Sequence, residues 1–333
     1  MDQKIRFAVV GYGHMGKRHV SVIQEHPDCK LAAVIDMHQQ PMLPGIPFYN
    51  DLDDFLESSA VTETDVVVIA TPNGLHAQHA LKCLDAQKHV LIEKPMALSK
   101  ADADAIIAKA KEVQRQVFVM MQNRFSPVSS WLKELTQSGV LGKIFLVQVN
   151  CFWNRDQRYY KKESWHGTRE LDGGTLFTQF SHFIDLIYWC FGDISNIHSS
   201  FRNFNHNGVI DFEDTGIVHF DFVKGGMGSL SYTTAVWDKN LESSITVIAE
   251  NGSVKVAGQY MDKVEYCHIK DYALPRLEDR MHQKAGQRTN PGTANHDLIL
   301  ENILRALKSV DGSVVSGNDG WKVVDMIQNI YKN

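Results

Sequence analysis

Cysteine is scarce: the 333-residue chain has five, and no two of them form a C-x-x-C pair. An odd number of scattered thiols argues against a disulfide framework and against a structural zinc site. The histidines form no H-E-x-x-H motif, and His76 and His79, at the start of a helical pattern, have no third ligand nearby. We therefore expect reduced cysteines that serve packing, and no bound metal.

Long apolar runs and concentrations of basic residues are also lacking. No apolar stretch approaches the length of a membrane span, and the N-terminus leads into a strand without the apolar segment of a signal peptide. The net charge is −5, and no run of Lys or Arg offers a surface for nucleic acid or anionic lipid. These absences favour a cytoplasmic protein whose substrate is a small molecule.

The most informative motif that is present stands near the N-terminus. An apolar strand, residues 7–10, runs into Gly11-Tyr12-Gly13-His14-Met15-Gly16, which has the G-x-G-x-x-G pattern of dinucleotide-binding folds. Gly11 permits the tight turn, Gly13 lets the backbone approach a pyrophosphate, and Gly16 lets the helix lie close to the sheet. The N–H groups at the start of that helix can then bind phosphate oxygens.

Asp36 indicates which dinucleotide is bound. It closes the second predicted strand, where a carboxylate accepts hydrogen bonds from both ribose hydroxyls and repels a 2'-phosphate. No arginine follows at Met37 or His38 to bind such a phosphate. We therefore expect NAD as the cofactor, with NADP less favoured.

Length and pattern together predict an α/β chain of two domains, because 333 residues exceed the usual size of a single core. In the first part, apolar strands alternate with amphipathic helices, which predicts a Rossmann domain with a parallel sheet. Its helix after Ser99 has that residue as a candidate N-cap and Asp102 in its first turn. The domain is expected to cover residues 1–122, with strands at residues 6–10, 31–35, 65–70, 89–92 and 117–121.

The second domain, residues 123–333, is expected to hold a large, mostly antiparallel open sheet, because its strands follow one another with little more than turns between most of them. One face of such a sheet needs a partner, so a homodimer or homotetramer is expected. The last helix could pack back on the first domain, and residues 274–292 are expected to form a loop. The strands are expected at residues 144–152, 197–204, 216–222, 228–236, 244–249 and 264–269, and helices at 174–191, 294–307 and 321–331.

Two groups of residues could carry chemistry, and the first is Glu93-Lys94-Pro95. It follows the strand at residues 89–92, at the edge where parallel sheets bind ligands. Pro95 keeps Lys94 out of helical backbone angles, and a partly desolvated lysine can have its pKa lowered toward neutrality. Taken alone, the same triplet is equally typical of an ordinary surface turn.

The second group is Asp172-Gly173-Gly174 followed by His182 and Asp185. His182 and Asp185 are three residues apart, so they share a helix face. A histidine held by a carboxylate is suited to proton transfer near neutral pH. The alternative is a helix cap followed by an interior histidine.

Taken together, these motifs stand in the order seen in the Gfo/Idh/MocA oxidoreductases, which the sequence resembles over nearly its whole length. The resemblance implies an oxidoreductase that acts on a secondary alcohol of a sugar or cyclitol, with an open sheet used for oligomerisation. It implies that Lys94 and His182 are catalytic and that Glu93 holds the nicotinamide ribose. It also implies cofactor contacts from Gly11, Gly13, His14, Met15, Gly16, Asp36, Thr71, Pro72, Asn73, His76, Glu93, Lys94 and Asn123.

The sequence departs from the family at Thr178, where many members carry an aspartate four residues before the histidine. Threonine can form hydrogen bonds but supplies no charge. The departure puts a carboxylate-backed His182 in doubt and favours Lys94 as the proton-transferring group. Asp185 stays open as a replacement carboxylate.

Residues 122–127, 150–160 and 165–174 are similar to UDP-N-acetylglucosaminuronic acid 3-dehydrogenases of surface-polysaccharide pathways. Basic side chains here could bind a diphosphate and a uronate, and aromatic ones could stack on uracil or a sugar. The alternative is that the aromatic side chains belong to the core and the basic ones to a solvated rim. Substrate contacts are expected from Arg124, Arg155, Tyr159, Trp165, Thr178 and His182.

We therefore expect an NAD-dependent enzyme that takes a hydride from C3 of a UDP-linked N-acetylaminouronic acid. Lys94 would accept the hydroxyl proton and His182 would hydrogen-bond to the same oxygen. Two alternatives stay open: a dehydrogenase of a free sugar or inositol, and a non-catalytic NAD(P)-binding regulator.

Overall fold

The computed structural model describes residues 4–38, 43–277, 295–308 and 315–333, and the chain divides into two compact units. Unit 1 comprises Met1–Met120 and Gly292–Val324, and unit 2 comprises Met121–Pro291 and Asp325–Asn333. The sequence-based expectation was a single division after residue 122, and residues 292–324 are here grouped with unit 1.

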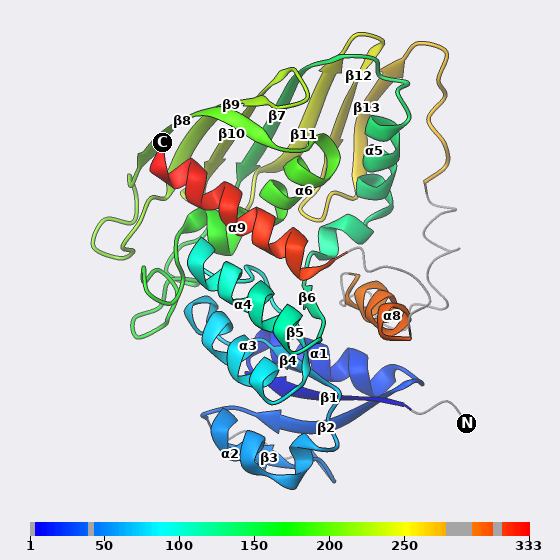
Figure 1. The fold of residues 1–333 in the computed structure, drawn as a ribbon. Coiled ribbons are helices and arrows are strands. Elements are labelled where there is room, and N and C mark those ends of the chain that lie inside the picture. The colour runs from blue at the N-terminus through cyan, green and yellow to red at the C-terminus, as the bar shows by residue number, and fades with distance from the viewer. Residues whose placement is uncertain (1–3, 39–42, 278–294, 309–314) are drawn as a thin grey trace. The chain divides into compact units, whose positions relative to one another are not determined.

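Unit 1 is built on a six-stranded parallel sheet with the order β3-β2-β1-β4-β5-β6 (Figure 1). Its central strands are buried on both faces, which explains their unbroken apolar sequences. The strands are β1 (Ile5–Val10), β2 (Cys29–Ile35), β3 (Phe48–Tyr49), β4 (Val66–Ile69), β5 (His89–Ile92) and β6 (Val117–Val119). All of them except the short β3 were predicted within a residue or two.

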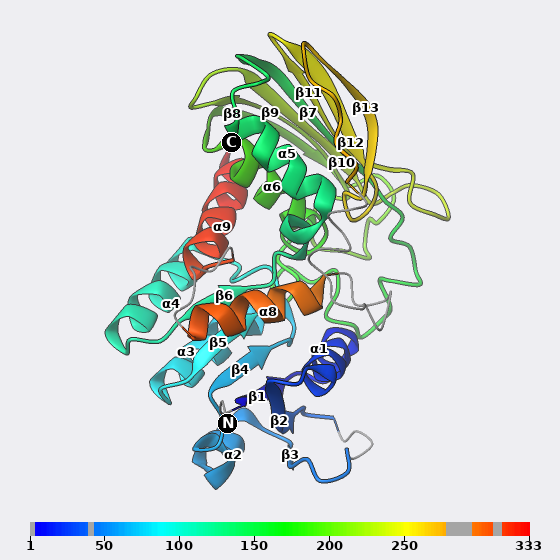
Figure 2. The same cartoon turned by 90° about the vertical axis from the view of Figure 1, so that its right-hand side faces the viewer.

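Helices cover both faces of this sheet. Helices α1 (His14–Glu25) and α8 (His296–Leu307) contact each other, as do α3 (His76–Asp85) and α4 (Lys100–Glu112), and the two pairs lie on opposite faces (Figures 1 and 2). The Ser99 side chain accepts a hydrogen bond from the Asp102 amide, so the predicted N-cap of α4 is confirmed. The short helix α2 (Leu52–Glu57) follows β3.

Unit 2 contains a seven-stranded sheet with the order β13-β12-β11-β7-β10-β9-β8. Every neighbouring pair is antiparallel except β7 and β10, which are parallel, so the predicted mostly antiparallel sheet is confirmed. The strands are β7 (Ile144–Phe152), β8 (Ile194–Arg202), β9 (Thr215–Phe222), β10 (Met227–Thr233), β11 (Glu242–Ala249), β12 (Gly252–Ala257) and β13 (Lys263–Ile269). Strand β12 was not predicted.

One face of this sheet packs against α5 (Pro127–Gln137) and α6 (Ser181–Phe191), while no described helix of unit 2 covers the other face (Figure 2). The 3-10 turn η3 (Gln122–Phe125) precedes α5, and the π-helical turn η4 (Leu176–Phe180) precedes α6. The last helix, α9 (Gly317–Lys332), has residues in both units. Residues 278–292 of the predicted loop lie outside the described residues. No helix among those described combines the length and the apolar character needed to cross a bilayer.

Candidate active site

The glycine motif between β1 and α1 has the geometry of a dinucleotide-binding turn. A Cβ atom on Gly11 would lie 2.5 Å from the Ala70 carbonyl oxygen, and one on Gly16 would lie 1.8 Å from the Gly11 oxygen. Gly11 also has φ of +89°, which favours glycine. Gly13 faces open space, and no side chain caps α1, so backbone N–H groups face the side on which a pyrophosphate would approach.

Asp36 lies beside this turn, at the end of β2. Its carboxylate accepts hydrogen bonds from the amides of Tyr12 (2.6 Å) and His38 (2.8 Å). The first bond fixes the acid next to the glycine motif, where the sequence places a ribose-binding group. The glycine turn and the acid together fit NAD.

His76 joins the loop after β4 to the turn after β5. Its Nδ1 lies 2.7 Å from the Pro95 carbonyl oxygen, and its Nε2 lies 2.8 Å from that of Thr71. The ring has no exposed surface, and burial lowers the pKa of His76. His76 thus ties Thr71 to Pro95, and its expected contact with the cofactor stays a prediction.

Glu93 also points into the interior of unit 1. Its Oε1 accepts a hydrogen bond from His19 Nε2 at 2.7 Å, its Oε2 lies 3.3 Å from the Lys94 amide nitrogen, and its exposure is 5%. Burial alone would raise the pKa of Glu93, but the hydrogen bond from His19 and the nearby charges lower it to about 2. The carboxylate therefore lies beside the turn that carries Lys94, and its expected contact with the nicotinamide ribose stays a prediction.

His296 of α8 completes this buried cluster, with Nε2 4.0 Å from Glu93 Oε1 and its ring edge-on to that of His19. The potential ligand atoms of His19, Glu93 and His296 lie within 4.8 Å of one another, a grouping that could hold a metal ion. The direct hydrogen bond from His19 accounts for the arrangement without one. The sequence analysis missed the cluster because its members come from distant parts of the chain.

In unit 2, His182 lies in the first turn of α6, and both His182 and Thr178 are 7% exposed. Asp185 forms a buried ion pair with Arg124: the guanidinium Nε lies 2.9 Å from Oδ2. Arg124 is 3% exposed, and its contact with the substrate stays a prediction. Asn123, expected to contact the cofactor, is 2% exposed in η3.

A partly exposed cluster of aromatic and polar side chains follows β7. The Arg155 guanidinium lies 4.8 Å from the ring centroid of Trp153 and 5.3 Å from that of Tyr159. Its Nε donates to Gln179 Oε1 at 2.6 Å, and Gln179 Nε2 donates to the Tyr159 hydroxyl at 2.8 Å. Structure and sequence agree in bringing Arg155 and Tyr159 together, but the linking Gln179 was missed, since an amide after Thr178 carries no distinctive sequence signal.

Trp165 extends this aromatic group. Its ring stacks on His166 with centroids 3.9 Å apart, and His166 in turn meets Tyr159 at 4.4 Å. Burial raises the pKa of the Tyr159 hydroxyl, so it is a neutral hydrogen-bonding group near neutral pH. Flat rings beside a guanidinium are suited to bind a base or a sugar face.

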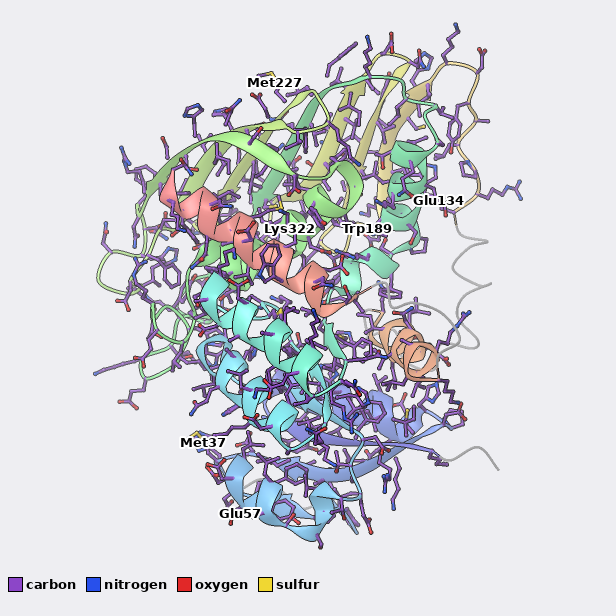
Figure 3. All side chains as sticks on the ribbon, in the orientation of Figure 1. Met37, Glu57, Glu134, Trp189, Met227 and Lys322 are labelled. Carbon is purple, nitrogen blue, oxygen red and sulfur yellow. The ribbon has the colours of Figure 1, made fainter. Side chains whose placement is uncertain are left out.

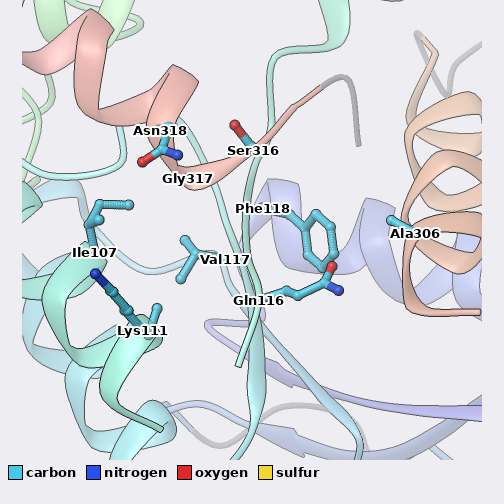
Figure 4. A pocket seen from close by; sticks show the side chains of 10 residues that line it. Ile107, Lys111, Gln116, Val117, Phe118, Ala306, Ser316, Gly317 and Asn318 are labelled. Atoms are coloured by element: carbon cyan, nitrogen blue, oxygen red, sulfur yellow. The ribbon is translucent and has the colours of Figure 1, made fainter. Parts of the chain in front are cut away.

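A separate hollow of about 620 Å³ lies between β6, α4 and the ends of α8 and α9 in unit 1 (Figure 4). Apolar side chains such as Ile107, Val117 and Phe118 make up much of its lining, to which Lys111 also contributes. None of the predicted site residues contributes to it. It therefore has no part in the candidate active site.

Comparison with known proteins identifies the family. Residues 5–121 match the oxidoreductase family with an NAD-binding Rossmann fold, and residues 130–255 match the GFO/IDH/MocA C-terminal domain. The chain belongs to the Gfo/Idh/MocA family. The expected fold class, the NAD cofactor and the assignment as an NAD-dependent oxidoreductase are thereby confirmed.

Two solved structures are similar over the whole chain. One is the WlbA dehydrogenase of Chromobacterium violaceum in complex with NADH and UDP-GlcNAcA, with 30% identity, a TM-score of 0.87, and coverage of 100% of this chain and 94% of that one. The other is WlbA of Bordetella pertussis with the same two ligands, with 29% identity, a TM-score of 0.85 and coverage of 99% and 96%. An uncharacterized oxidoreductase of Synechocystis is 29% identical over 57% of this chain and 52% of its own length.

Proposed function

We propose that the chain is an NAD-dependent dehydrogenase that oxidises the C3 hydroxyl of a UDP-linked N-acetylaminouronic acid. The observation that carries the proposal is the full-length likeness to two dehydrogenases whose structures contain NADH and UDP-GlcNAcA. The cluster of Arg155, Tyr159 and Trp165 supports it, because a guanidinium beside aromatic rings suits a nucleotide sugar better than a free polyol.

We assign Lys94 as the base that accepts the hydroxyl proton. It follows β5 at the C-terminal edge of the parallel sheet, in a turn held by Glu93 and His76. Bound NAD supplies the hydride acceptor. His182 is proposed to hydrogen-bond to the substrate, and Arg155 to contact the uronate or diphosphate.

The first experiment follows nicotinamide absorbance in single-turnover mixtures of the purified chain, NAD and UDP-N-acetylglucosaminuronic acid. Reduction of NAD with this substrate, but not with myo-inositol or glucose, would support a nucleotide-sugar dehydrogenase. Reduction with a free polyol alone would instead establish the free-sugar alternative. NAD binding without reduction by any of the three would favour a regulator.

Substitution of Lys94 tests its proposed role. Lys94→Met should lower turnover at least about 100-fold, the usual contribution of a positioned proton acceptor, while leaving NAD affinity nearly unchanged. Lys30→Met, which removes an exposed lysine from β2 of the same unit, is the matched control and should keep full activity. A turnover of Lys94→Met close to that of the wild type would exclude Lys94 as the base.

We further propose that a second copy of the chain covers the open face of the sheet in unit 2. Met227 and Ile217 are 57% and 48% exposed on this face, and Met227 lies on the outer side of the sheet in Figure 3. On adjacent strands of this face, such exposed apolar side chains lie near one another, with polar side chains around them. This pattern is typical of a sheet that pairs with another protein surface.

A further inference from the structure

A buried pair of side chains, Asp172 and Thr178, stands directly before His182. Thr178 Oγ1 donates to the Asp172 carboxylate in a short hydrogen bond, and it also lies 2.9 Å from the Asp172 carbonyl oxygen. The second carboxylate oxygen accepts from the Gly167 amide at 2.7 Å. Asp172 is 1% exposed, so a carboxyl group is enclosed at this point of unit 2.

The backbone around the pair is shaped to hold it. The Asp172 amide donates to the Thr168 carbonyl, and Gly173 and Gly174 follow with φ of +90° and +136°, values that favour glycine. The chain then forms the π-helical turn η4, which contains Thr178. Such turns widen a helix by one residue and frequently occur at functional sites.

The hydrogen bonds indicate which form the acid takes. Two donors, a hydroxyl and a backbone amide, point at its oxygens, and donors favour the ionised form of a carboxyl group. Burial is the main cause that raises the pKa of Tyr159 and of Tyr160, and the negative charge of Asp172 raises both further. The charge of Asp172 therefore influences the aromatic cluster, which is the proposed substrate region.

Thr178 stands four residues before His182, the spacing at which two side chains share a face of a regular helix, and the η4–α6 junction lies between them. A threonine hydroxyl has one proton. Because Thr178 donates this proton to Asp172, the Thr178 oxygen is left as an acceptor. It can accept a hydrogen bond from an imidazole N–H.

We propose that Asp172 is a positioning residue for His182, acting through the Thr178 hydroxyl to orient the imidazole and to stabilise a positive charge on it. For catalysis this inference rests on the proposed function. It gives Thr178 a role that needs no charge of its own. It also separates the two acids of this segment: Asp185 pairs with Arg124, and Asp172 serves the histidine.

Two other charged groups near α6 have partners among the described residues. Arg124 of η3 pairs with Asp185, and Lys133 of α5 donates to the Trp189 carbonyl. Both are present in wild type and variants alike. A change in the titration of His182 on altering Asp172 therefore reports on that acid.

The test measures the titration of His182 in the full-length protein, by NMR of 13C-labelled histidine, with His182→Gln to assign the signal. In Asp172→Asn, the midpoint should shift by about one unit to lower pH. Turnover should fall about tenfold at unchanged NAD affinity, the change that one pKa unit of lost interaction gives. Adding Thr178→Asp to Asp172→Asn returns a carboxylate to the same place and should restore both.

Two further variants keep the test decisive if Asp172→Asn folds poorly. Thr178→Val removes the hydroxyl at nearly constant shape and should shift the titration, whereas Thr178→Ser should not. Asp211→Asn, in an exposed acid that binds the Arg169 amide, is the control and should change nothing.

An unchanged His182 titration in Asp172→Asn, or in Thr178→Val where the first variant does not fold, would overturn the inference whatever the substrate is. If the titration shifts but the wild type oxidises no sugar, the positioning role stands and the proposed function fails. The two hypotheses are thus tested separately.

Discussion

At the scale of single residues, Glu93 makes stability depend on pH. Its folded pKa is about 2 against an ordinary value of 4.5: burial raises the pKa, but the hydrogen bond from His19 and the charges of His19, His296 and Lys94 together lower it by more. A group whose pKa is lowered on folding stabilises the fold at pH values above its pKa in the unfolded chain. This contribution is lost as the pH falls through its pKa in the folded protein. The full contribution is about 3 kcal/mol.

We therefore expect the wild type to have a higher free energy of unfolding than Glu93→Gln above pH 4.5. This difference should decrease between pH 4.5 and pH 2, the interval spanned by the two pKa values. Urea denaturation at several pH values gives the difference. Glu301→Gln removes the exposed partner of His26 from the same unit, and its difference from wild type should vary much less. A constant difference between wild type and Glu93→Gln would refute the linkage.

Residue types predicted the first unit better than the second. Gly11, Gly16 and Asp36 could be assigned from sequence because their roles depend on backbone geometry next to them in the chain. The pairing of Arg124 with Asp185 could not be predicted, because the two residues are 61 positions apart. A basic side chain beside aromatic ones has the same sequence signature whether it binds a ligand or a buried acid.

At the scale of elements, the C-terminal part of α9 fixes the start of η4. The Tyr331 hydroxyl accepts from the Leu176 amide at 3.0 Å and donates to Glu213 at 2.7 Å. The Tyr331 hydroxyl oxygen also lies 2.6 Å from the position that a Cβ atom on Gly174 would occupy. A helix end from the C-terminus thus sets the position of the turn that precedes His182.

Gly174→Ala should therefore destabilise unit 2 for two reasons. The positive φ of +136° costs about 1 to 2 kcal/mol for alanine, and the contact with Tyr331 adds about 2 kcal/mol. Gly208→Ala, at φ +73° with nothing near its Cβ, carries the first cost alone and is the control. Thermal and urea unfolding give both values.

A double-mutant cycle completes this test. In the Tyr331→Phe background, which lacks the hydroxyl, Gly174→Ala should cost less than in the wild type, because the atom nearest to the added Cβ is gone. Equal costs for Gly174→Ala with and without the hydroxyl would show that Tyr331 does not hold this turn.

Elements were predictable where the period of apolar residues is regular. The central strands of the parallel sheet are unbroken apolar runs such as β4, and predicted strands of the second sheet such as β10 alternate, since buried faces impose both patterns. The parallel pairing of β7 and β10 was not foreseeable, because direction depends on how distant segments meet. The π-helical turn η4 has the apolar sequence of an ordinary helix, so its extra residue leaves no mark in the pattern.

At the scale of the whole molecule, the open face of the seven-stranded sheet decides whether the chain acts alone. Register places Ile217, Met227 and Ile248 on this face, since Ile217 lies opposite Ser231, and both Met227 and Ile248 lie opposite Leu146. The buried side chains of the same strands face the helices. The sheet therefore has a packed side and a partly apolar exposed side.

If a second copy covers this face, two charges on it should separate the copies. We expect the wild type to sediment at twice or four times the chain mass, and Ile217→Asp with Ile248→Asp to sediment as a single chain, because an unpaired buried carboxylate costs several kcal/mol. Val209→Asp, a charge on an equally exposed residue of a loop, should leave assembly unchanged. Sedimentation equilibrium over a range of concentrations measures this, and a wild type that stays a single chain at every concentration would show that the face is not an interface between copies.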